Sequence, residues 1–246
     1  MPEVTEDLLL GGRVRLLQPA RGHRAGTDAV LLAASGPVAA GDVVMDVGAA
    51  TGAVGLMAGV REKAAHFVFV ERDPDLAELC RRNCEQNAIQ GQVVTADVLD
   101  KASRLAVGLQ PESASLVLTN PPFLGEGQAR ISPDPGRAAA HAMPAGGLEA
   151  WLRACVGLLK PKGRLVLIHR ADSLADCLSL MGRGMGGIAL RFVHPAIDQP
   201  AIRVLVSAVK GSRGPVSVLP PVILNGPDGR FTPQAEALHR GEAFLL

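Results

Sequence analysis

The chain has 246 residues, of which 48% are hydrophobic, and a formal net charge of +1. This length and composition predict a folded protein with a sizeable core and exclude a largely disordered chain. The near-neutral charge neither indicates nor excludes a nucleic-acid partner, because a basic face can exist within a neutral total. No apolar run approaches the roughly 20 residues of a membrane span, and the acidic N-terminus is unlike a signal peptide. We therefore expect a soluble, cytoplasmic protein.

Strand-like and helix-like segments alternate along the chain. Runs rich in apolar and β-branched residues predict strands at 42–48, 66–71, 91–97, 114–120, 164–170, 188–195 and 201–211. Runs with helical spacing predict helices at 53–62, 73–88, 147–160 and 173–184. The alternation predicts an α/β fold with a doubly wound, mostly parallel, seven-stranded sheet. The last two strands are joined by a short turn, so we expect them to form an antiparallel hairpin at one edge.

The four cysteines are Cys80, Cys84, Cys155 and Cys177, and no two of them have the C-x-x-C spacing of a zinc site. Cys80 and Cys84 lie one helical turn apart, which favours buried thiols over ligands or a disulfide. We expect no bound metal.

The segment DVGAATG, residues 46–52, places Asp46 at the end of a predicted strand and Gly48 and Gly52 in the turn before a helix. In open α/β sheets, ligands bind beyond the carboxyl ends of the strands. Glycine lets the backbone come close to a ligand, and a helix N-terminus offers free N–H groups. Ala50 stands where many such turns have glycine. The turn by itself also fits a nicotinamide-binding fold.

Two more acidic residues end the next two predicted strands. Glu71 can accept two hydrogen bonds from a ribose diol, and its alternative interpretation is a solvated loop acid beside Arg72. Asp97 can accept a hydrogen bond from an exocyclic adenine amine, and its alternative is a helix cap. Together with Asp46, these acids occupy three successive strand ends. This arrangement predicts an adenosine-shaped slot.

The next predicted strand, 114–120, leads into the motif NPPF, Asn120 to Phe123. No hydride-transfer mechanism requires this motif. The chain also lacks the catalytic tyrosine of a short-chain dehydrogenase. A nucleobase amine is a poor nucleophile because its lone pair is delocalised. The side-chain oxygen of Asn120 and the carbonyl of Pro121 can each accept one N–H and so aim the lone pair. Pro121 and Pro122 restrict the backbone, which holds both acceptors in place beforehand. Phe123 would stack on the base.

With these motifs the chain resembles the class I S-adenosylmethionine-dependent methyltransferases, in the branch that methylates amino groups. Within that branch it is similar to the tRNA adenine-N6 methyltransferases that act on the adenine 3′ of the anticodon of valine tRNA. Residues 24–34 match that family's GTD segment, and 163–181, 191–195 and 218–238 resemble its downstream parts. The resemblance implies a Rossmann-like fold, S-adenosylmethionine as the cofactor and tRNA as a partner.

The resemblance also implies two sets of site residues. The catalytic set is the target-base motif, Asn120, Pro121, Pro122 and Phe123. The cofactor-binding set comprises Arg24, Gly26, Thr27, Asp28, Asp46, Gly48, Ala49, Thr51, Gly52, Glu71, Arg72, Asp97, Val98 and Asn120. Gly26, Thr27 and Asp28 would line the methionine end of the cofactor. Ala50 replaces a common glycine, which would loosen or shift the turn, and Phe123 replaces a tyrosine, which keeps the stacking face.

A tRNA enzyme needs basic side chains for phosphate contacts. The candidates are Arg13, Arg15, Arg21, Arg24, Lys160, Lys162 and Arg170. We interpret His141 and His169 as structural, because the proposed chemistry needs no general base. Residues 124–146, rich in Gly, Pro and Ala, form a loop longer than compact domains usually keep without a use. We interpret this loop as a mobile lid beside the active site; the alternative is a tolerated insertion.

Three functions remain open at this point. The first is a tRNA adenine-N6 methyltransferase. The second has the same chemistry on another planar amine, in rRNA guanine N2, DNA adenine or a protein glutamine amide. The third is a cofactor-binding RNA module without turnover, for which Ala50 is the support. We expect an N-terminal segment (1–40) that contributes to the cofactor site, a methyltransferase domain (41–211) and a C-terminal extension (212–246) packed on that domain.

Overall fold

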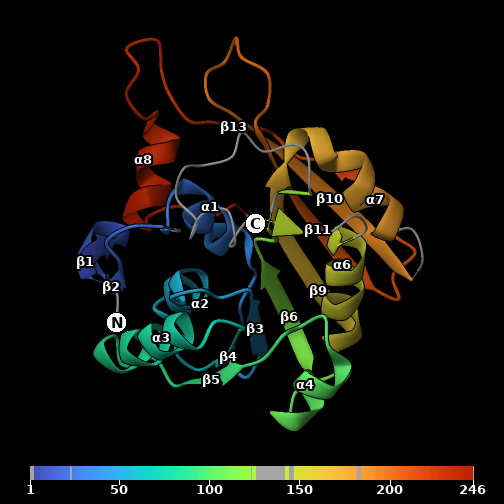
Figure 1. The fold of residues 1–246 in the computed structure, drawn as a ribbon. Coiled ribbons are helices and arrows are strands. Elements are labelled where there is room, and N and C mark those ends of the chain that lie inside the picture. Colours follow the sequence, from blue (N-terminus) through green and yellow to red (C-terminus); the bar gives the residue numbers. More distant parts are fainter. Residues whose placement is uncertain are drawn as a thin grey trace.

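The computed structural model describes residues 3–22, 24–122, 124–125, 142–143, 147–181 and 184–245. A nine-stranded sheet runs through its centre, with helices on both faces (Figure 1). Its strands are β3 (Val43–Val47), β4 (His66–Glu71), β5 (Gly91–Thr95), β6 (Ala114–Thr119), β9 (Leu159–Arg170), β10 (Met185–His194), β11 (Arg203–Lys210), β12 (Ser217–Val218) and β13 (Val222–Ile223). The strand order is β12-β10-β11-β9-β6-β3-β4-β5, and β13 also pairs with β10.

The sheet is parallel except around β11. Strand β3 lies parallel to both β4 and β6, β4 to β5, and β6 to β9. Strand β11 is antiparallel to β9 on one side and to β10 on the other. The predicted mostly parallel sheet with an antiparallel hairpin is therefore confirmed. The hairpin does not end the sheet, because β12 and β13 from the C-terminal tail pair with β10 and cover its edge.

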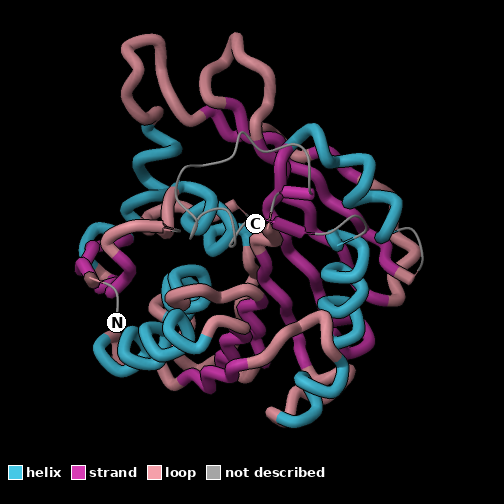
Figure 2. The backbone as a smooth tube through the Cα atoms, viewed as in Figure 1, coloured by secondary structure: helices cyan, strands magenta, loops and turns pink. Residues whose placement is uncertain are grey.

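Two layers of helices enclose the sheet (Figure 2). The helices are α1 (Thr27–Ser35), α2 (Ala53–Gly59), α3 (Pro74–Gln86), α4 (Lys101–Ala106), α6 (Gly147–Leu158), α7 (Leu174–Met181) and α8 (Pro233–Arg240), with short 3-10 turns η1 (Leu10–Gly12) and η2 (Ala171–Ser173). Buried side chains of α1, α2, α3 and α8 pack on one face of the sheet, and those of α6 and α7 pack on the other. All four cysteines are free and buried, which confirms the prediction made for Cys80 and Cys84.

Helix α3 shows how directly some local signals act. Asp73 caps it, since its side chain accepts hydrogen bonds from the backbone N–H groups of Asp75 and Leu76, and Pro74 occupies the first turn.

Elsewhere the boundaries of the elements differ from the prediction. Strand β9 begins at Leu159, directly after α6, and not at residue 164. Its early residues join the sheet because Leu159 pairs with Ala114 of β6 before a register shift.

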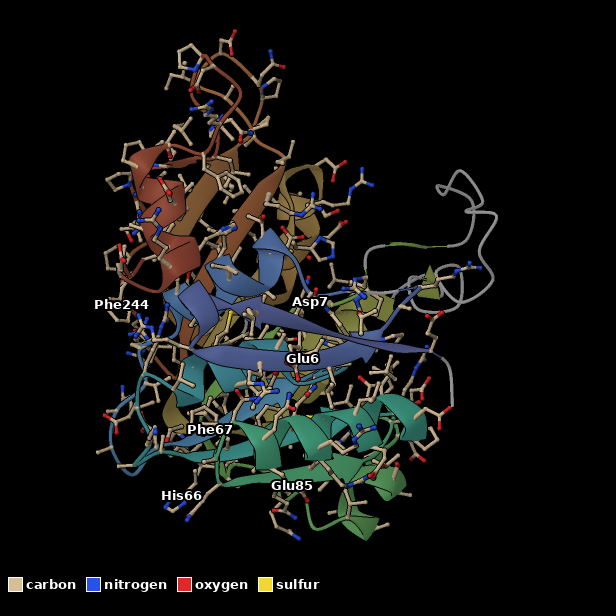
Figure 3. All side chains as sticks on the ribbon, turned by 90° about the vertical axis from the view of Figure 1, so that its left-hand side faces the viewer. Glu6, Asp7, His66, Phe67, Glu85 and Phe244 are labelled. Atoms are coloured by element: carbon tan, nitrogen blue, oxygen red, sulfur yellow. The ribbon has the colours of Figure 1, made fainter. Side chains whose placement is uncertain are left out.

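An N-terminal hairpin was not predicted. Strands β1 (Val4–Leu9) and β2 (Val14–Pro19) pair antiparallel, and β2 lies beside α3. In Figure 3, Glu6 and Asp7 mark the hairpin and Glu85 marks α3. The buried residues Val14 and Leu16 alternate with exposed ones along β2, so a period-two pattern was present but short.

Most of the predicted lid lies outside the described residues. Within it the structure describes β7 (Leu124–Gly125) and β8 (Ala142–Met143), which pair in parallel. Whether the segment acts as a lid thus stays a prediction. No helix in the described ranges has both the length and the apolar character needed to cross a membrane.

Candidate functional site

Several of the predicted site residues lie together at the carboxyl edge of the sheet. Val47 of β3 is in register with Val70 of β4 and Thr119 of β6. The next residues along these strands, Gly48, Glu71 and Asn120, therefore emerge side by side. This edge is where open α/β sheets bind ligands.

The glycine turn between β3 and α2 depends on left-handed backbone conformations. Gly48, Ala50 and Gly52 have φ angles of +75°, +48° and +88°. The N–H groups of Gly48 and Ala49 donate to the Val70 carbonyl at 2.9 and 3.1 Å. Ala50 thus adopts the conformation that glycine would hold, and the turn closes around it. Whether Ala50 loosens or shifts the turn stays a prediction.

The ring of Trp151, in α6, packs against this turn at Gly48. A Cβ atom on Gly48 would lie 2.9 Å from the Trp151 ring. The indole Nε1 donates to Thr119 Oγ1 at 2.9 Å, and that hydroxyl donates to the Val47 carbonyl at 2.8 Å. Sequence reasoning missed Trp151, although it is the one tryptophan of a chain that has no tyrosine.

This contact predicts that Gly48→Ala will destabilise the protein. The new methyl group would meet the Trp151 ring, and alanine pays a cost of about 1–2 kcal/mol in the left-handed region. We expect the free energy of unfolding in urea to fall by about 2 kcal/mol or more. Gly157→Ala in α6 is the control, because a Cβ there meets nothing within 4 Å; it should be neutral or stabilise by up to about 1 kcal/mol. Equal stability of the two variants would rule out the steric explanation.

Glu71 is held tightly at the end of β4. One carboxylate oxygen accepts from the Ala50 N–H at 2.8 Å and the other from the Asp73 N–H at 2.9 Å. The side chain is buried, so the alternative of a solvated loop acid is wrong. Each oxygen retains a further lone pair that can accept from a diol. Arg72 next to it is exposed.

Asp46 is buried beneath the turn. Its Oδ2 accepts from the Gly55 N–H at 2.8 Å. Burial raises the pKa of this carboxyl to about 7, the Gly55 hydrogen bond opposes the rise, and the nearby charge of Glu71 adds to it. The site therefore contains a carboxyl group that changes its charge near neutral pH.

Asp97 follows β5 and is half-buried. Its Oδ1 accepts from the Leu99 N–H at 2.8 Å, and its other carboxylate oxygen accepts no hydrogen bond from the described residues. The alternative of a helix cap is wrong, because Asp100 caps α4. Val98 is buried beside it. Asp97 thus retains a free acceptor at the end of β5.

The GTD segment begins α1, with Gly26 at its N-cap. Thr27 Oγ1 lies 3.3 Å from Nε2 of His239 in α8, and Asp28 Oδ2 accepts from Arg203 Nε of β11 at 2.8 Å. His239, a second residue that sequence reasoning missed, also stacks on Phe231 with ring centroids 4.5 Å apart. The segment is therefore fixed from both α8 and β11.

Arg24 lies against the N-terminal hairpin, and its predicted contact with the cofactor stays a prediction. Its guanidinium forms an ion pair with Asp7 and donates to Thr5 Oγ1 and the Pro19 carbonyl, both at 2.8 Å. These contacts hold the side chain on the N-terminal hairpin. No described contact joins it to the glycine turn.

The target-base motif starts directly after β6. Asn120 Oδ1 is buried and has no hydrogen-bond partner among the described residues. A buried acceptor left unsatisfied costs about 1–3 kcal/mol, and such atoms are rare in folded proteins. Pro121 is buried and Pro122 is half-buried, whereas Phe123 lies outside the described residues. Asn120 therefore presents a vacant acceptor at the sheet edge.

Several of the predicted phosphate-binding residues have partners within the chain. Arg15 pairs with Glu6 and Arg170 with Asp172, and Arg13 donates to the Gly241 carbonyl at 2.5 Å. Lys162 Nζ lies 3.5 Å from the Gly211 carbonyl. Arg21 and Lys160 are exposed.

Two histidines, His141 and His169, were predicted to be structural. His169 is buried, and burial lowers its pKa, which favours the neutral ring. His141 lies outside the described residues. In the part of the chain that the structure describes, no three His, Cys, Asp or Glu side chains are grouped so as to hold a metal ion.

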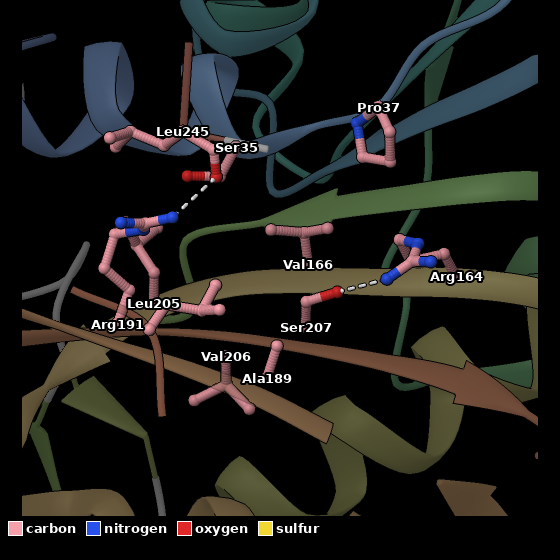
Figure 4. A pocket seen from close by; sticks show the side chains of 11 residues that line it. Ser35, Pro37, Arg164, Val166, Ala189, Arg191, Leu205, Val206, Ser207 and Leu245 are labelled. Atoms are coloured by element: carbon pink, nitrogen blue, oxygen red, sulfur yellow. Dashed lines mark hydrogen bonds between the residues drawn. The ribbon is translucent and has the colours of Figure 1, made fainter. Parts of the chain in front are cut away.

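A cavity of about 230 Å³ lies elsewhere, on the sheet face beside the end of α1 (Figure 4). It is lined by residues of β9, β10 and β11, with Arg164 donating to Ser207 Oγ at 2.8 Å and Arg191 to the Leu245 carbonyl at 3.4 Å. None of the predicted site residues lines it. The cavity is thus separate from the predicted adenosine slot at the carboxyl edge.

Comparison with known proteins gives concordant matches. The family model described as methyltransferase small domain matches residues 25–175. A tRNA1(Val) (adenine(37)-N6)-methyltransferase of Porphyromonas gingivalis is 35% identical over 159 residues, covering 62% of this chain and 61% of that protein. The chain thus spans less than two thirds of that relative. The protein of the same name from Aeromonas salmonicida is 30% identical over 192 residues, covering 76% of this chain and 77% of its own length.

Among solved structures, the fold is similar to that of the protein Atu636 from Agrobacterium tumefaciens, described as a predicted O-methyltransferase. The TM-score is 0.73 at 30% sequence identity, and the match covers 89% of this chain and 98% of that one. The names of these similar proteins thus differ in the atom that receives the methyl group.

Proposed function

The chain belongs to the methyltransferase small domain family, and on that premise we propose that it transfers a methyl group from S-adenosylmethionine to the exocyclic N6 amine of an adenine in tRNA, next to the anticodon. The proposal extends to the cofactor, the tRNA partner and a cytoplasmic location. It is supported by the geometry of the carboxyl edge and by the names of the similar tRNA-modifying proteins.

We assign the cofactor to three groups at neighbouring strand ends, which are Glu71, Asp97 and the glycine turn. Glu71 holds two oxygens with spare lone pairs toward a ribose diol, and Asp97 has a free oxygen for an adenine amine. The glycine turn lets the backbone approach the ligand between them. S-adenosylmethionine supplies an electrophilic methyl group on a sulfonium sulfur.

The substrate side depends on Asn120, which carries the proposal. Its buried, unpartnered Oδ1 can accept one N–H of the target amine, and the Pro121 carbonyl can accept the other. With both hydrogens held, the nitrogen lone pair is directed away from the ring and toward the methyl group. Because the acceptors belong to a rigid Asn-Pro-Pro backbone, little reorganisation accompanies the reaction.

An oxygen acceptor is the second candidate, favoured by the name of the Agrobacterium structure. A hydroxyl group carries a single hydrogen, so it would use only one of the two acceptors. Its activation depends on the removal of that hydrogen by a base, and two fixed acceptors do not serve that purpose. The pair of acceptors at Asn120 and Pro121 is therefore better matched to an amine.

The test is methyl transfer to RNA followed by nucleoside analysis. We expect the protein to move a radiolabelled methyl group from S-adenosylmethionine to tRNA from a strain that lacks the gene, and mass spectrometry to identify the product as N6-methyladenosine. Label in a 2′-O-methylated nucleoside would support the oxygen acceptor instead. Label in rRNA, DNA or protein but not tRNA would contradict the tRNA assignment, and absence of label from every acceptor would contradict the activity.

A further inference from the structure

Two asparagine side chains, Asn83 of α3 and Asn87 at its C-cap, bind the free edge of β2 in the way that a neighbouring strand would. Asn83 Oδ1 accepts from the Leu17 N–H at 2.8 Å, and its Nδ2 donates to the Leu17 carbonyl at 2.8 Å. Asn87 repeats the pattern one helical turn later on Arg15, at 2.8 and 2.7 Å. These two matched amide groups attach the hairpin to this helix, and Gln86 adds to them, since its Nε2 donates to the Arg15 carbonyl at 2.7 Å and to Asn83 Oδ1 at 3.0 Å.

The two asparagines differ in one further contact. The second hydrogen of Asn83 Nδ2 is donated to the Thr51 carbonyl, in the glycine turn, at 2.9 Å. The corresponding group of Asn87 donates to the Asn83 carbonyl within α3 itself. Asn83 is completely buried at this junction. It alone of the pair joins the hairpin to the turn.

The contact acts on the most strained part of the turn. Thr51 lies between Ala50 and Gly52, which both have left-handed backbone conformations. A non-glycine residue in that region costs about 1–2 kcal/mol, and it persists only where neighbouring groups restrain it. Glu71 restrains one side through the Ala50 N–H, and Asn83 restrains the other through the Thr51 carbonyl.

We propose that Asn83 is a positioning residue of the cofactor site, which fixes the glycine turn and links it to the N-terminal hairpin. The inference rests on the proposed function, because S-adenosylmethionine is the ligand assigned to the turn. Asn83 acts through Thr51, so it sets the affinity for the cofactor and not the rate of the chemical step. Cofactor binding, in turn, stabilises the attachment of β2.

The matched variants Asn83→Ala and Asn87→Ala separate this role from simple attachment of the hairpin. Each removes two hydrogen bonds to β2, but only Asn83→Ala also releases Thr51. Asn83→Ala also removes an acceptor of Gln86, whose bond to the Arg15 carbonyl is present in both variants. By calorimetric titration with S-adenosylhomocysteine, we expect Asn83→Ala to raise the dissociation constant about tenfold and Asn87→Ala to change it less than twofold. The KM for S-adenosylmethionine should follow the same pattern, with kcat at saturation unchanged in both variants.

Equal weakening by the two variants, or no weakening by Asn83→Ala, would overturn the inference. Failure of the wild-type protein to bind S-adenosylhomocysteine would instead contradict the proposed function. If Asn83→Ala does not fold, amide hydrogen exchange of the wild type by NMR provides the test. We expect S-adenosylhomocysteine to slow exchange of the Leu17 amide, which bonds to Asn83, at least threefold more than that of the Arg15 amide, which bonds to Asn87. Equal effects on both amides, or none, would overturn it.

Discussion

Asn120→Ala is expected to slow methyl transfer by about 10²–10³-fold while leaving the affinity for S-adenosylhomocysteine within about twofold of wild type. The substitution removes one of the two acceptors proposed to hold the target amine. It leaves the carboxylates of Glu71 and Asp97 in place for the cofactor. Single-turnover rates with tRNA and calorimetric titration with the cofactor product measure the two effects separately.

Stability provides an independent check on the same variant. Asn120 Oδ1 has no hydrogen-bond partner, so its removal relieves an unsatisfied buried acceptor. We expect the free energy of unfolding to stay unchanged or to rise by about 1 kcal/mol. Gln110→Ala, which removes an exposed side-chain amide before β6, is the control and should keep the wild-type rate. Methyl transfer by Asn120→Ala at a rate near that of the control would mean that Asn120 does not hold the amine.

Asp46 is expected to make the protein less stable as the pH rises from about 4 to about 7. Its carboxyl stays protonated in the folded state up to a pKa of about 7, whereas the model value for the unfolded chain is 3.8. Between these values the folded state binds more protons than the unfolded state, so raising the pH favours unfolding. A shift of about three units corresponds to an upper limit of about 4 kcal/mol.

Asp46→Asn isolates this contribution. The amide oxygen can still accept from the Gly55 N–H, and the ionisable group is gone. We expect the difference in unfolding free energy, variant minus wild type, to grow from pH 4 to 7 and then level off, as measured by urea titration. Asp198→Asn, which alters an exposed loop carboxylate, should show a difference that stays below about 1 kcal/mol over this range. A flat difference for Asp46→Asn would mean that the buried carboxyl does not titrate near neutral pH.

The features that could be predicted from the sequence depend on residues close together in the chain. The ends of β3, β4, β5 and β6 follow from apolar runs of strand length, and the acids Asp46, Glu71 and Asp97 follow from their places at those ends. The cap and first turn of α3 also depend only on neighbouring residues, Asp73 and Pro74. Parallel strands bring their carboxyl ends to one edge, so the grouping of these residues could be predicted without any knowledge of packing.

Other features depend on residues far apart in the chain. The hairpin β1–β2 is held by Asn83 and Asn87, which lie 66 and 72 positions from their partners. The Trp151 ring packs against Gly48, and His239 of the C-terminal helix α8 contacts Thr27. No local pattern identifies such pairs, because each side chain is compatible with many surroundings.

The sequence by itself determined the α/β alternation, the parallel sheet and the positions of the acidic residues and of Asn120 along its edge. These depend on periodicity and on turn residues, which act over a few positions. The tertiary structure alone decided that Ala50 can adopt a left-handed conformation, that Arg24 pairs with Asp7 and that the Asp46 carboxyl is buried. Backbone strain, ion pairing and the pKa of a buried group are set by which distant atoms surround a residue, and only the folded chain brings those atoms together.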